Sequence, residues 1–282
     1  MANWYERSGV AGEPGLRHDG RAGASSTHGG IEATLTTPPE QVRLQLPEQG
    51  ESLDGTAGGG MADEPRRRRM VSLFAGGGGL TLGLARAGFE TVWASDIERT
   101  SAATFQRNMP EVPFVLGDVR HLTPSRVKEL SGDGPIDLLV GGPPCQGFST
   151  IGDQITGDPR NSMFEAYQRI AAWLRPTCFL MENTSYLRSQ YGGAYAEEIR
   201  QAMGDLGYEI QTATLNAADY GTAQIRKRVF FFGTLLDGPF EFPSADHGDG
   251  TGQPYRSVGD SIMDLVDAGD EVSNHVALKH GE

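Results

Sequence analysis

The residues best suited to covalent chemistry lie in one loop, Gly141-Gly-Pro-Pro-Cys-Gln-Gly-Phe-Ser149. Its thiol, Cys145, follows two prolines that fix the backbone, and nearby glycines allow a planar substrate to come close. The apolar run 136–140 precedes the loop, so we expect the loop at the carboxyl end of a strand, where α/β sheets bind ligands. A cysteine presented in this way is typical of a nucleophile. The alternative is a rigid structural loop with an incidental thiol.

A second loop, Phe74-Ala-Gly-Gly-Gly-Gly-Leu80, is built from glycines that let a backbone turn sharply and approach a ligand. An acid follows about 20 residues later at Asp96, a spacing that suits hydrogen bonds to a ribose. Asp118 is expected to end the next strand and could accept from an adenine amino group. No Lys-Ser/Thr pair follows the glycines, which excludes a P-loop. The pattern favours an adenosine-bearing cofactor, although the glycines alone would also suit a tight strand-to-helix turn.

The elements that must position these loops alternate along the chain. The apolar runs expected to be strands are residues 70–74, 91–95, 113–116, 136–140, 177–181 and 229–232. Helical spacing is found at residues 80–87 and 97–108, and a further helix is expected around 258–266. Strands that are apolar on both faces and separated by helices indicate a parallel sheet covered on both sides. The predicted fold class is therefore α/β, with a doubly wound, mostly parallel sheet.

The composition divides the chain into three parts. Residues 1–69 are rich in Gly, Ser, Thr, Pro and charge, and we expect them to be disordered because they can bury little apolar surface. The run Arg66–Arg69 is expected to be a solvated lead-in to the first strand rather than a phosphate contact. Residues 70–240 are expected to form the α/β domain, and residues 241–282 a partly ordered tail.

Charge and cysteine content exclude several classes of protein. The formal net charge of the 282-residue chain is -13, so the whole molecule is not a generic polyanion binder. Its two cysteines exclude a disulfide-rich scaffold, and no metal site is expected. The second cysteine, Cys178, lies within the apolar run 177–181 and is expected to be inert core. We find no apolar segment suited to a membrane span or a signal peptide, and expect a cytoplasmic protein.

Four motifs in the same order resemble those of the DNA cytosine-5 methyltransferase family, over about residues 70–235. Phe74–Leu80 resembles the cofactor loop of that family, and Pro144-Cys145-Gln146 resembles its catalytic loop. Glu182-Asn183-Thr184 resembles its Glu-Asn-Val element, and Asn216–Arg228 contains the counterpart of its Gln-x-Arg-x-Arg segment. Two departures are Thr184 in place of valine and Ala223 where proline is usual. The resemblance implies the Rossmann-like fold of S-adenosylmethionine-dependent methyltransferases.

The resemblance also implies a role for each matched residue. The residues that would bind S-adenosylmethionine are Phe74, Gly76, Gly77, Gly79, Leu80, Asp96, Ile97, Asp118, Val119 and Pro144. Asp96 would bind the ribose, Ile97 would pack on the adenine, and Asp118 with Val119 would hold the adenine edge. The catalytic residues would be Cys145, Glu182, Arg226 and Arg228, with Gln224 in support.

The implied reaction explains these residue types. Thiolate addition by Cys145 at carbon 6 of cytosine turns carbon 5 into a nucleophile. Glu182 would stabilise or supply the proton on ring nitrogen 3, and Arg228 would bind the base oxygen. Because a stacked base cannot be reached, the cytosine must leave the duplex. The expected function is transfer of a methyl group to carbon 5 of cytosine in double-stranded DNA, in restriction-modification or regulation, with the protein associated with the nucleoid.

The resemblance does not extend to DNA recognition. In this family a variable target-recognition region and a Gly-Asn element follow the matched segment, and nothing after Arg228 resembles them. We therefore expect a second methyltransferase subunit to supply recognition. The alternatives are a truncated inactive protein, a regulatory cofactor-binding subunit, and an RNA cytosine-5 methyltransferase.

Overall fold

The computed structural model describes residues 66–144, 162–188 and 193–266. The strands are β1 (Arg68–Leu73), β2 (Phe89–Asp96), β3 (Phe114–Leu116), β4 (Leu138–Gly141), β5 (Cys178–Thr184), β6 (Glu209–Asn216) and β7 (Lys227–Thr234). The α-helices are α1 (Gly79–Arg86), α2 (Arg99–Asn108), α3 (Pro124–Ser131), α4 (Ser162–Leu174), α5 (Ala194–Gly204) and α6 (Val258–Ile262). The short 3₁₀ turns are η1 (Val119–His121), η2 (Ser185–Arg188), η4 (Ala217–Tyr220) and η5 (Met263–Leu265).

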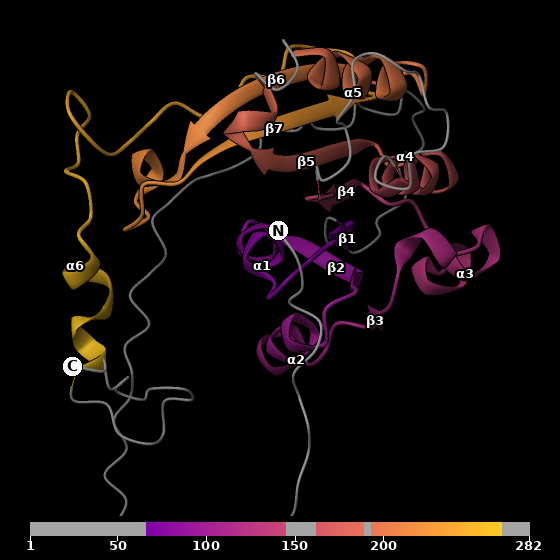
Figure 1. Cartoon of the computed structure of the whole chain (residues 1–282), viewed down its shortest axis with the longest axis horizontal. Helices are drawn as coiled ribbons and strands as arrows, with labels where there is room; N and C mark the ends of the chain where they lie inside the picture. The colour runs from indigo at the N-terminus through magenta and orange to yellow at the C-terminus, as the bar shows by residue number, and fades with distance from the viewer. Residues whose placement is uncertain (1–65, 145–161, 189–192, 267–282) are drawn as a thin grey trace, which may run out of the picture. The chain divides into compact units, whose positions relative to one another are not determined.

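The strands form one sheet in the order β3-β2-β1-β4-β5-β7-β6 (Figure 1). Strands β1 to β5 run parallel, whereas β7 is antiparallel to both of its neighbours, β5 and β6. The prediction of a mostly parallel α/β sheet is thus confirmed. The sequence did not predict the edge strand β6, in which polar residues such as Gln211 and Thr214 interrupt the apolar ones. The chain winds outward in both directions from β1 and β4, and such a switch point is where open α/β sheets bind ligands.

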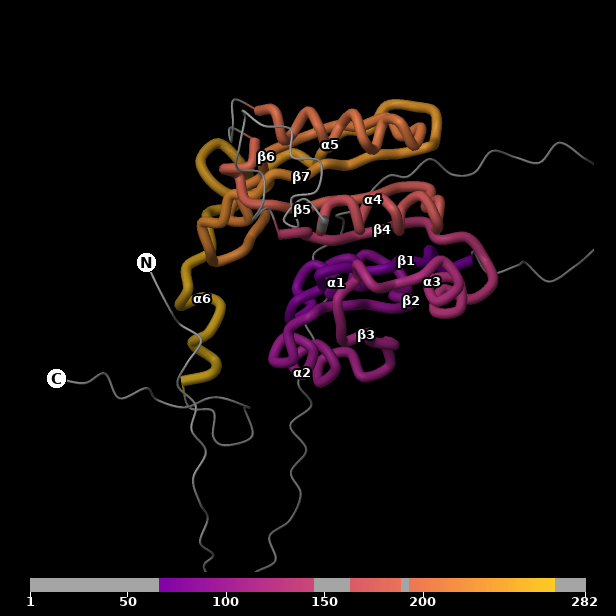
Figure 2. Tube along the Cα trace, turned by 45° about the vertical axis from the view of Figure 1, so that its right-hand side comes forward, coloured from indigo at the N-terminus to yellow at the C-terminus, as the bar shows by residue number. Residues whose placement is uncertain are grey.

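Alternate residues of the strands build the core on the two faces of the sheet. In β1, Val71 and Leu73 pack in the cluster that also contains side chains of α3, α4 and α5. The preceding residue, Met70, packs on the other face with Leu84 of α1. Figure 2 shows α3, α4 and α5 on one side of the sheet and α1 and α2 on the other. Both faces are covered, which is why the strands are apolar on both faces.

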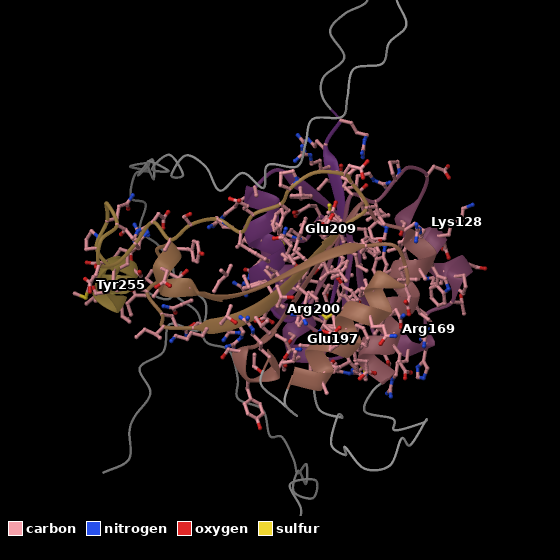
Figure 3. The ribbon with its side chains drawn as sticks, turned by 90° about the horizontal axis from the view of Figure 1, so that it is seen from above. Lys128, Arg169, Glu197, Arg200, Glu209 and Tyr255 are labelled. Atoms are coloured by element: carbon pink, nitrogen blue, oxygen red, sulfur yellow. The ribbon has the colours of Figure 1, made fainter. Side chains whose placement is uncertain are left out.

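The outer faces of α4 and α5 carry charged side chains. On α5, Arg200 pairs with Glu197 at 3.0 Å, and on α4 the Arg169 guanidinium lies 5.8 Å from the ring centre of Trp173 (Figure 3). No helix in the described ranges is long and apolar enough to cross a membrane.

The arginine run before β1 differs from the prediction of a solvated lead-in. Strand β1 begins at Arg68, two residues earlier than expected. Arg66 donates to both oxygens of the Asp137 carboxylate, at 2.9 and 2.7 Å, and the Arg69 backbone amide donates to the same carboxylate at 2.6 Å. The Arg69 side chain also donates to the carbonyl of Gly134, at 2.9 Å. Arg66 is exposed, as expected of a lead-in, but it also serves as the charged partner of the buried Asp137, and Arg69 lies within β1 rather than ahead of it.

The expected helix near residues 258–266 is present as α6 followed by η5. A capping box in which Ser257 and Asp260 bond each other's backbone amides starts α6. Residues 267–282, like residues 1–65, lie outside the described part of the chain.

Candidate active site

The glycine-rich loop leaves β1 with left-handed backbone. Phe74 has φ 52°, a conformation that costs a non-glycine residue about 1–2 kcal/mol, and Gly76 has φ 55°. The Gly76 amide donates to the Asp96 carboxylate at 2.8 Å, and Asp96 also accepts from the Glu98 amide at 2.9 Å. The carboxylate at the end of β2 therefore holds the loop in place.

The glycines of the loop have two different roles. Gly78 has φ 92° and is buried, and a Cβ there would lie 2.3 Å from Cε of Met109 and 2.9 Å from a ring carbon of Phe105. A Cβ at Gly76 or Gly79 would have no atom within 4 Å. Gly78 thus lets the start of α1 pack on α2, whereas Gly76 and Gly79 face open space that a ligand can occupy. The sequence did not separate these roles.

Exposed aliphatic side chains lie beside the glycine loop. Ile97, which follows β2, is 58% exposed, and Leu116, at the end of β3, is 49% exposed. Asp96 pairs with Leu116 in the parallel ladder, so these strand ends are neighbours. Leu116 was not among the predicted site residues, because it belongs to an apolar run that suggests core. The Val119 side chain is buried, which leaves its backbone as the part suited to ligand contact.

The Asp118 carboxylate is engaged by Arg120. It accepts from the Arg120 backbone amide at 2.9 Å, from Nε at 3.0 and 2.9 Å, and from Nη2 at 2.5 Å. This hydrogen bonding lowers the pKa of Asp118 below its usual value. The Asp118 side chain is only 10% exposed, so Arg120 covers most of the group expected to meet the adenine. Nothing in the sequence motif indicated Arg120.

These residues fit an adenosyl cofactor. The open backbone at Gly76 and Gly79 allows close approach, and the partly exposed Asp96 retains acceptor capacity for hydroxyl groups. Ile97 and Leu116 provide an apolar surface for a flat ring. The Leu80 side chain instead packs against the core beneath the loop.

A second cluster forms where β5 and β7 run antiparallel. Glu182 lies on β5, and the ladder places Thr184 opposite Arg228 of β7. Nε of Arg228 is 2.8 Å from Oε1 of Glu182, whereas Nη2 of Arg226 is 3.9 Å from the same atom. The side chains of Glu182 and Arg228 are 24% and 23% exposed, and that of Arg226 is 49% exposed. Arg228 is therefore the main partner that orients Glu182.

The loop after β4 begins beside Glu182. A Cβ added to Gly142 would lie 3.0 Å from Oε2 of Glu182, and Nδ2 of Asn183 donates to the Pro143 carbonyl at 2.8 Å. The sequence assigned Asn183 no role, although it ties this loop to β5. Pro144 is exposed at the end of the described segment. Cys145 lies outside the described residues, so its predicted role as nucleophile stays a prediction.

The turn before β7 is held by Asn216. Its Oδ1 accepts from the Arg226 amide at 3.0 Å, and its Nδ2 donates to Asp219 at 2.8 Å. Gln224, expected to support the site, is exposed in this turn, and its backbone amide donates to the Thr222 carbonyl.

Both clusters lie at the same edge of the sheet. The carboxyl ends of parallel strands meet at one edge, so the loops after β1 and β4 and the end of β5 are neighbours. A Cβ at Gly141 would lie 2.7 Å from the Leu73 carbonyl oxygen, which shows how closely the end of β4 packs on the end of β1. The predicted site residues that lie within the described ranges are thus gathered along the edge where the parallel strands have their carboxyl ends.

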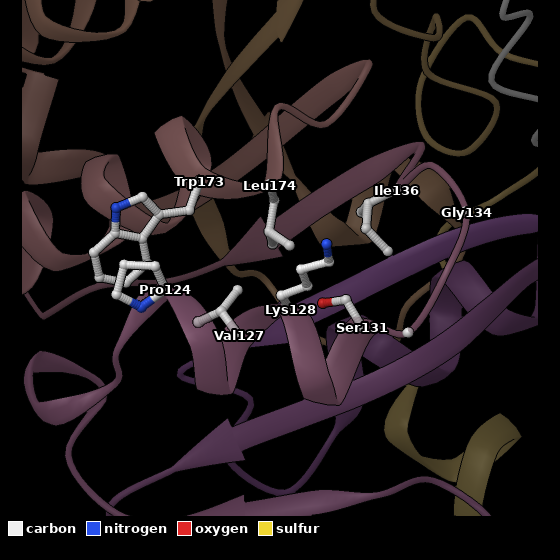
Figure 4. Close-up of a pocket in the computed structure, with 9 residues that line it drawn as sticks. Pro124, Val127, Lys128, Ser131, Gly134, Ile136, Trp173 and Leu174 are labelled. Carbon is white, nitrogen blue, oxygen red and sulfur yellow. The ribbon is translucent and has the colours of Figure 1, made fainter.

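A separate cavity of about 320 Å³ lies toward the amino ends of the strands (Figure 4). Val127 and Lys128 of α3, Trp173 and Leu174 of α4, and Ile136 before β4 contribute to its lining. None of the predicted site residues is among those that line it.

Cys178 behaves as predicted. It is fully buried in β5, where its thiol contacts the Thr234 hydroxyl at 3.5 Å. Burial raises the pKa of the Cys178 thiol, so the reactive thiolate is disfavoured. Within the ranges that the structure describes, no group of three His, Cys, Asp or Glu side chains could hold a metal ion.

Residues 68–280 match the sequence model of the C-5 cytosine-specific DNA methylase family. The Type II methyltransferase M1.HphI of Haemophilus parahaemolyticus is 34% identical over 74% of this chain and 57% of its own length. M.AquIA of Picosynechococcus sp. is 33% identical over 71% of this chain and 90% of its own length. The chain therefore spans little more than half of the first relative and nearly all of the second.

Two solved structures show the same fold. A prophage-encoded E. coli protein, provisionally described as a DNA modification methyltransferase, superposes with a TM-score of 0.58 at 32% identity, over 69% of this chain and 54% of its own. The Dnmt2 methyltransferase of S. pombe superposes with a TM-score of 0.55 at 21% identity, over 72% and 61%.

Proposed function

Because the chain belongs to the C-5 cytosine-specific DNA methylase family, we propose that it methylates carbon 5 of cytosine in double-stranded DNA. The observation that carries the proposal is the Glu182–Arg228 pair, placed beside the start of the loop that bears Cys145. The matched relatives are Type II methyltransferases, which favours a role in restriction-modification.

The residues divide the work of the reaction. The Cys145 thiolate adds to carbon 6 of an extruded cytosine, which makes carbon 5 nucleophilic. Glu182, oriented by Arg228, interacts with ring nitrogen 3 and stabilises the changing charge of the ring. When bound, S-adenosylmethionine supplies the methyl group. Loss of the carbon 5 proton to a base then expels the Cys145 thiolate and restores the aromatic ring.

The cofactor would lie over the glycine loop. Gly76, Gly77 and Gly79 with Phe74 would line its methionine and ribose part, and Asp96 would accept from the ribose hydroxyls. This assignment is favoured by the open space at Gly76 and Gly79 and by the exposed Ile97 at the end of β2.

The proposal includes a second polypeptide that supplies DNA recognition. The net charge of -13 favours it, since a chain this acidic is poorly suited to hold DNA alone. This chain matches 90% of the length of M.AquIA, so this Type II methyltransferase is a relative of similar chain length. Mixing this chain with the second polypeptide that recognises DNA should restore methylation. A second polypeptide that binds this chain tightly but gives no methylation would contradict this part of the proposal.

The test is covalent trapping on duplex DNA that contains 5-fluorocytosine. Fluorine cannot leave as a proton does, so a reacting enzyme stalls as an adduct with the DNA. We expect an adduct that requires cofactor and disappears in Cys145→Ser. An adduct formed by the chain alone would show that no second polypeptide is needed, whereas no adduct with any recognition partner would contradict the proposed activity.

A further inference from the structure

The segment that follows β7 folds back onto the turn that comes before the same strand. We call residues 243–255 of this segment the tail clasp. The carbonyl oxygen of Asp219, in η4, accepts hydrogen bonds from the backbone amides of Asp246 and His247, each at 3.0 Å. Backbone bonds therefore fasten the clasp to η4, just before the arginines of the second cluster.

Side chains add to this contact. The Tyr220 hydroxyl donates to the Pro243 carbonyl at 2.8 Å. The His247 ring, which is only 12% exposed, lies against Gly221. Gly221 has φ 80°, and a Cβ there would lie 2.8 Å from Cε1 of that ring. A side chain at position 221 would therefore exclude the clasp, which shows how closely the two segments fit.

The Asp219 carboxylate connects the clasp to the candidate site. Its Oδ1 accepts from the Tyr255 hydroxyl of the clasp at 3.2 Å and from Nδ2 of Asn216 at 2.8 Å. The other end of the Asn216 amide, Oδ1, accepts from the Arg226 backbone at 3.0 Å. Only this orientation of the amide satisfies both partners, because the carboxylate can only accept and the backbone N–H can only donate. Asp219 thus fixes the group that holds Arg226.

Arg226 depends on this support more than Arg228 does. Arg228 lies within β7 and pairs with Thr184 and Leu215 in the two ladders, so the sheet sets its position. Arg226 comes just before the strand begins. Its guanidinium lies 3.9 Å from the Glu182 carboxylate, so the placement of the turn decides whether this second positive charge reaches the site.

Building on the proposed function, we propose that Asp219 is a positioning residue for Arg226 and that the tail clasp is a working part of the active site. Asp219 acts through Asn216, and the clasp holds the Asp219 carboxylate from the other side. The Arg226 guanidinium is thereby kept near Glu182. There its charge acts together with that of Arg228 on the charge that develops in the cytosine ring.

The test separates the rate of the reaction from the number of working sites. The full chain, with its recognition polypeptide if one is needed, is mixed with S-adenosylmethionine and a saturating random-sequence duplex that contains 5-fluorocytosine. The final amount of covalent adduct counts the folded, competent sites, and the rate constant of adduct formation reports how well each site works. A merely structural role would lower the amount, whereas a positioning role lowers the rate constant.

The variants change one link at a time. Asp219→Ala removes the oxygen that Asn216 and Tyr255 share, whereas Asp219→Asn keeps an oxygen in that place. The double variant Tyr255→Phe with His247→Ala loosens the clasp alone. The matched control, Asp264→Ala, removes an exposed carboxylate of η5.

We expect Asp219→Ala to lower the rate constant about tenfold at a nearly unchanged final amount, because small displacements beside the reacting groups slow a reaction strongly. Asp219→Asn should restore most of the rate, the double clasp variant should lose about threefold, and Asp264→Ala should match the wild type. In a chain that already carries Arg226→Ala, Asp219→Ala should cause no further loss, because both act on the same group.

Several results would overturn the proposal. One is an unchanged rate constant in Asp219→Ala, or a loss of adduct amount alone. Another is a full loss of rate that persists in the Arg226→Ala chain. A double clasp variant with the wild-type rate would remove the clasp from the active site. Should Asp219→Ala fail to fold, the double clasp variant takes its place in every comparison.

Amide hydrogen exchange, followed by NMR, tests the positioning role without reference to activity. In Asp219→Ala the Arg226 amide should exchange about fivefold faster, because its acceptor on Asn216 is no longer held. The Val229 amide, within the β7 ladders, should be unchanged. If the wild type forms no adduct, the proposed function fails, and exchange alone decides whether Asp219 positions Arg226. An unchanged Arg226 amide, or an equal change at both amides, overturns that role.

Discussion

Glu182 shows how a single residue acquires its chemistry from its neighbours. On β5 it is a carboxylate at the end of a strand, which many structures use for capping or solubility. The antiparallel pairing with β7 brings Nε of Arg228 to 2.8 Å, and the β4 loop lies against its other oxygen. The pair keeps this carboxylate in one orientation at the mouth of the site, which a free side chain would not maintain.

Asp118 and Arg120 give a prediction that depends on pH. Because the pKa of Asp118 is lowered in the folded state, the pair stabilises the fold above the unfolded pKa of about 3.9, and this contribution is lost as the pH falls through the folded pKa. Arg120→Met should cost about 0.5–1 kcal/mol at pH 7 and progressively less below about pH 4. Urea unfolding at several pH values measures this difference.

The control for that experiment is Arg126→Met. Arg126 pairs with Glu129, but that carboxylate is 67% exposed, so the loss at pH 7 should be smaller. If the cost of Arg120→Met were the same at pH 7 and at about pH 2, the ion pair would not be its cause.

At the scale of elements, the β1–α1 connection serves packing and ligand binding with adjacent glycines. Gly78 faces α2, and Gly79 begins α1 in open surroundings. The loop also carries Phe74 in left-handed backbone, held by the hydrogen bond from Gly76 to Asp96. Such strain persists where surrounding contacts impose it, and it is found preferentially at functional sites.

The two glycines are predicted to respond differently to the same substitution. Gly78→Ala should lower the free energy of unfolding by about 2–4 kcal/mol, because Ala must adopt φ 92° and its Cβ meets Met109 and Phe105. Gly79→Ala, at a helical position with open space, should be neutral or stabilise by up to about 1 kcal/mol. Chemical denaturation without cofactor measures both. If both substitutions changed the free energy of unfolding equally, the contact of Gly78 with α2 would not distinguish the two glycines.

At the scale of the whole molecule, charge is distributed unevenly. The chain carries 37 acidic and 24 basic Lys or Arg residues, yet Arg188 and Lys227 are exposed beside the site edge. Acidic surface elsewhere opposes non-specific binding, so contact with DNA should rely on few phosphates.

The salt dependence of DNA binding follows from this distribution. With one phosphate contact each from Arg188 and Lys227, the logarithm of the binding constant should fall with the logarithm of salt concentration with a slope of about -2. Arg188→Ala and Lys227→Ala should each make the slope shallower by about one, while Lys128→Ala, at the cavity toward the opposite edge, should leave it unchanged. Fluorescence anisotropy of this chain alone, at salt concentrations low enough for its weak DNA binding to be measured, gives the slope, and a much steeper value would reveal phosphate contacts elsewhere.

The sequence by itself determined the features that depend on local backbone chemistry. The glycine loop, the strand-ending Asp96 and the mostly parallel α/β sheet all follow from short patterns in consecutive residues. The inert character of Cys178 followed in the same way from its place within an apolar strand.

Only the tertiary structure decided which distant groups meet. The reversal of β7 places Arg228 on Glu182, and Arg120 turns back onto Asp118. The buried Asp137 takes Arg66 and the Arg69 amide as partners, and Gly78 packs on α2. These contacts depend on strand direction, burial and side-chain orientation. A one-dimensional pattern carries no such information, because the same residues in the same order are compatible with several pairings until the sheet selects one.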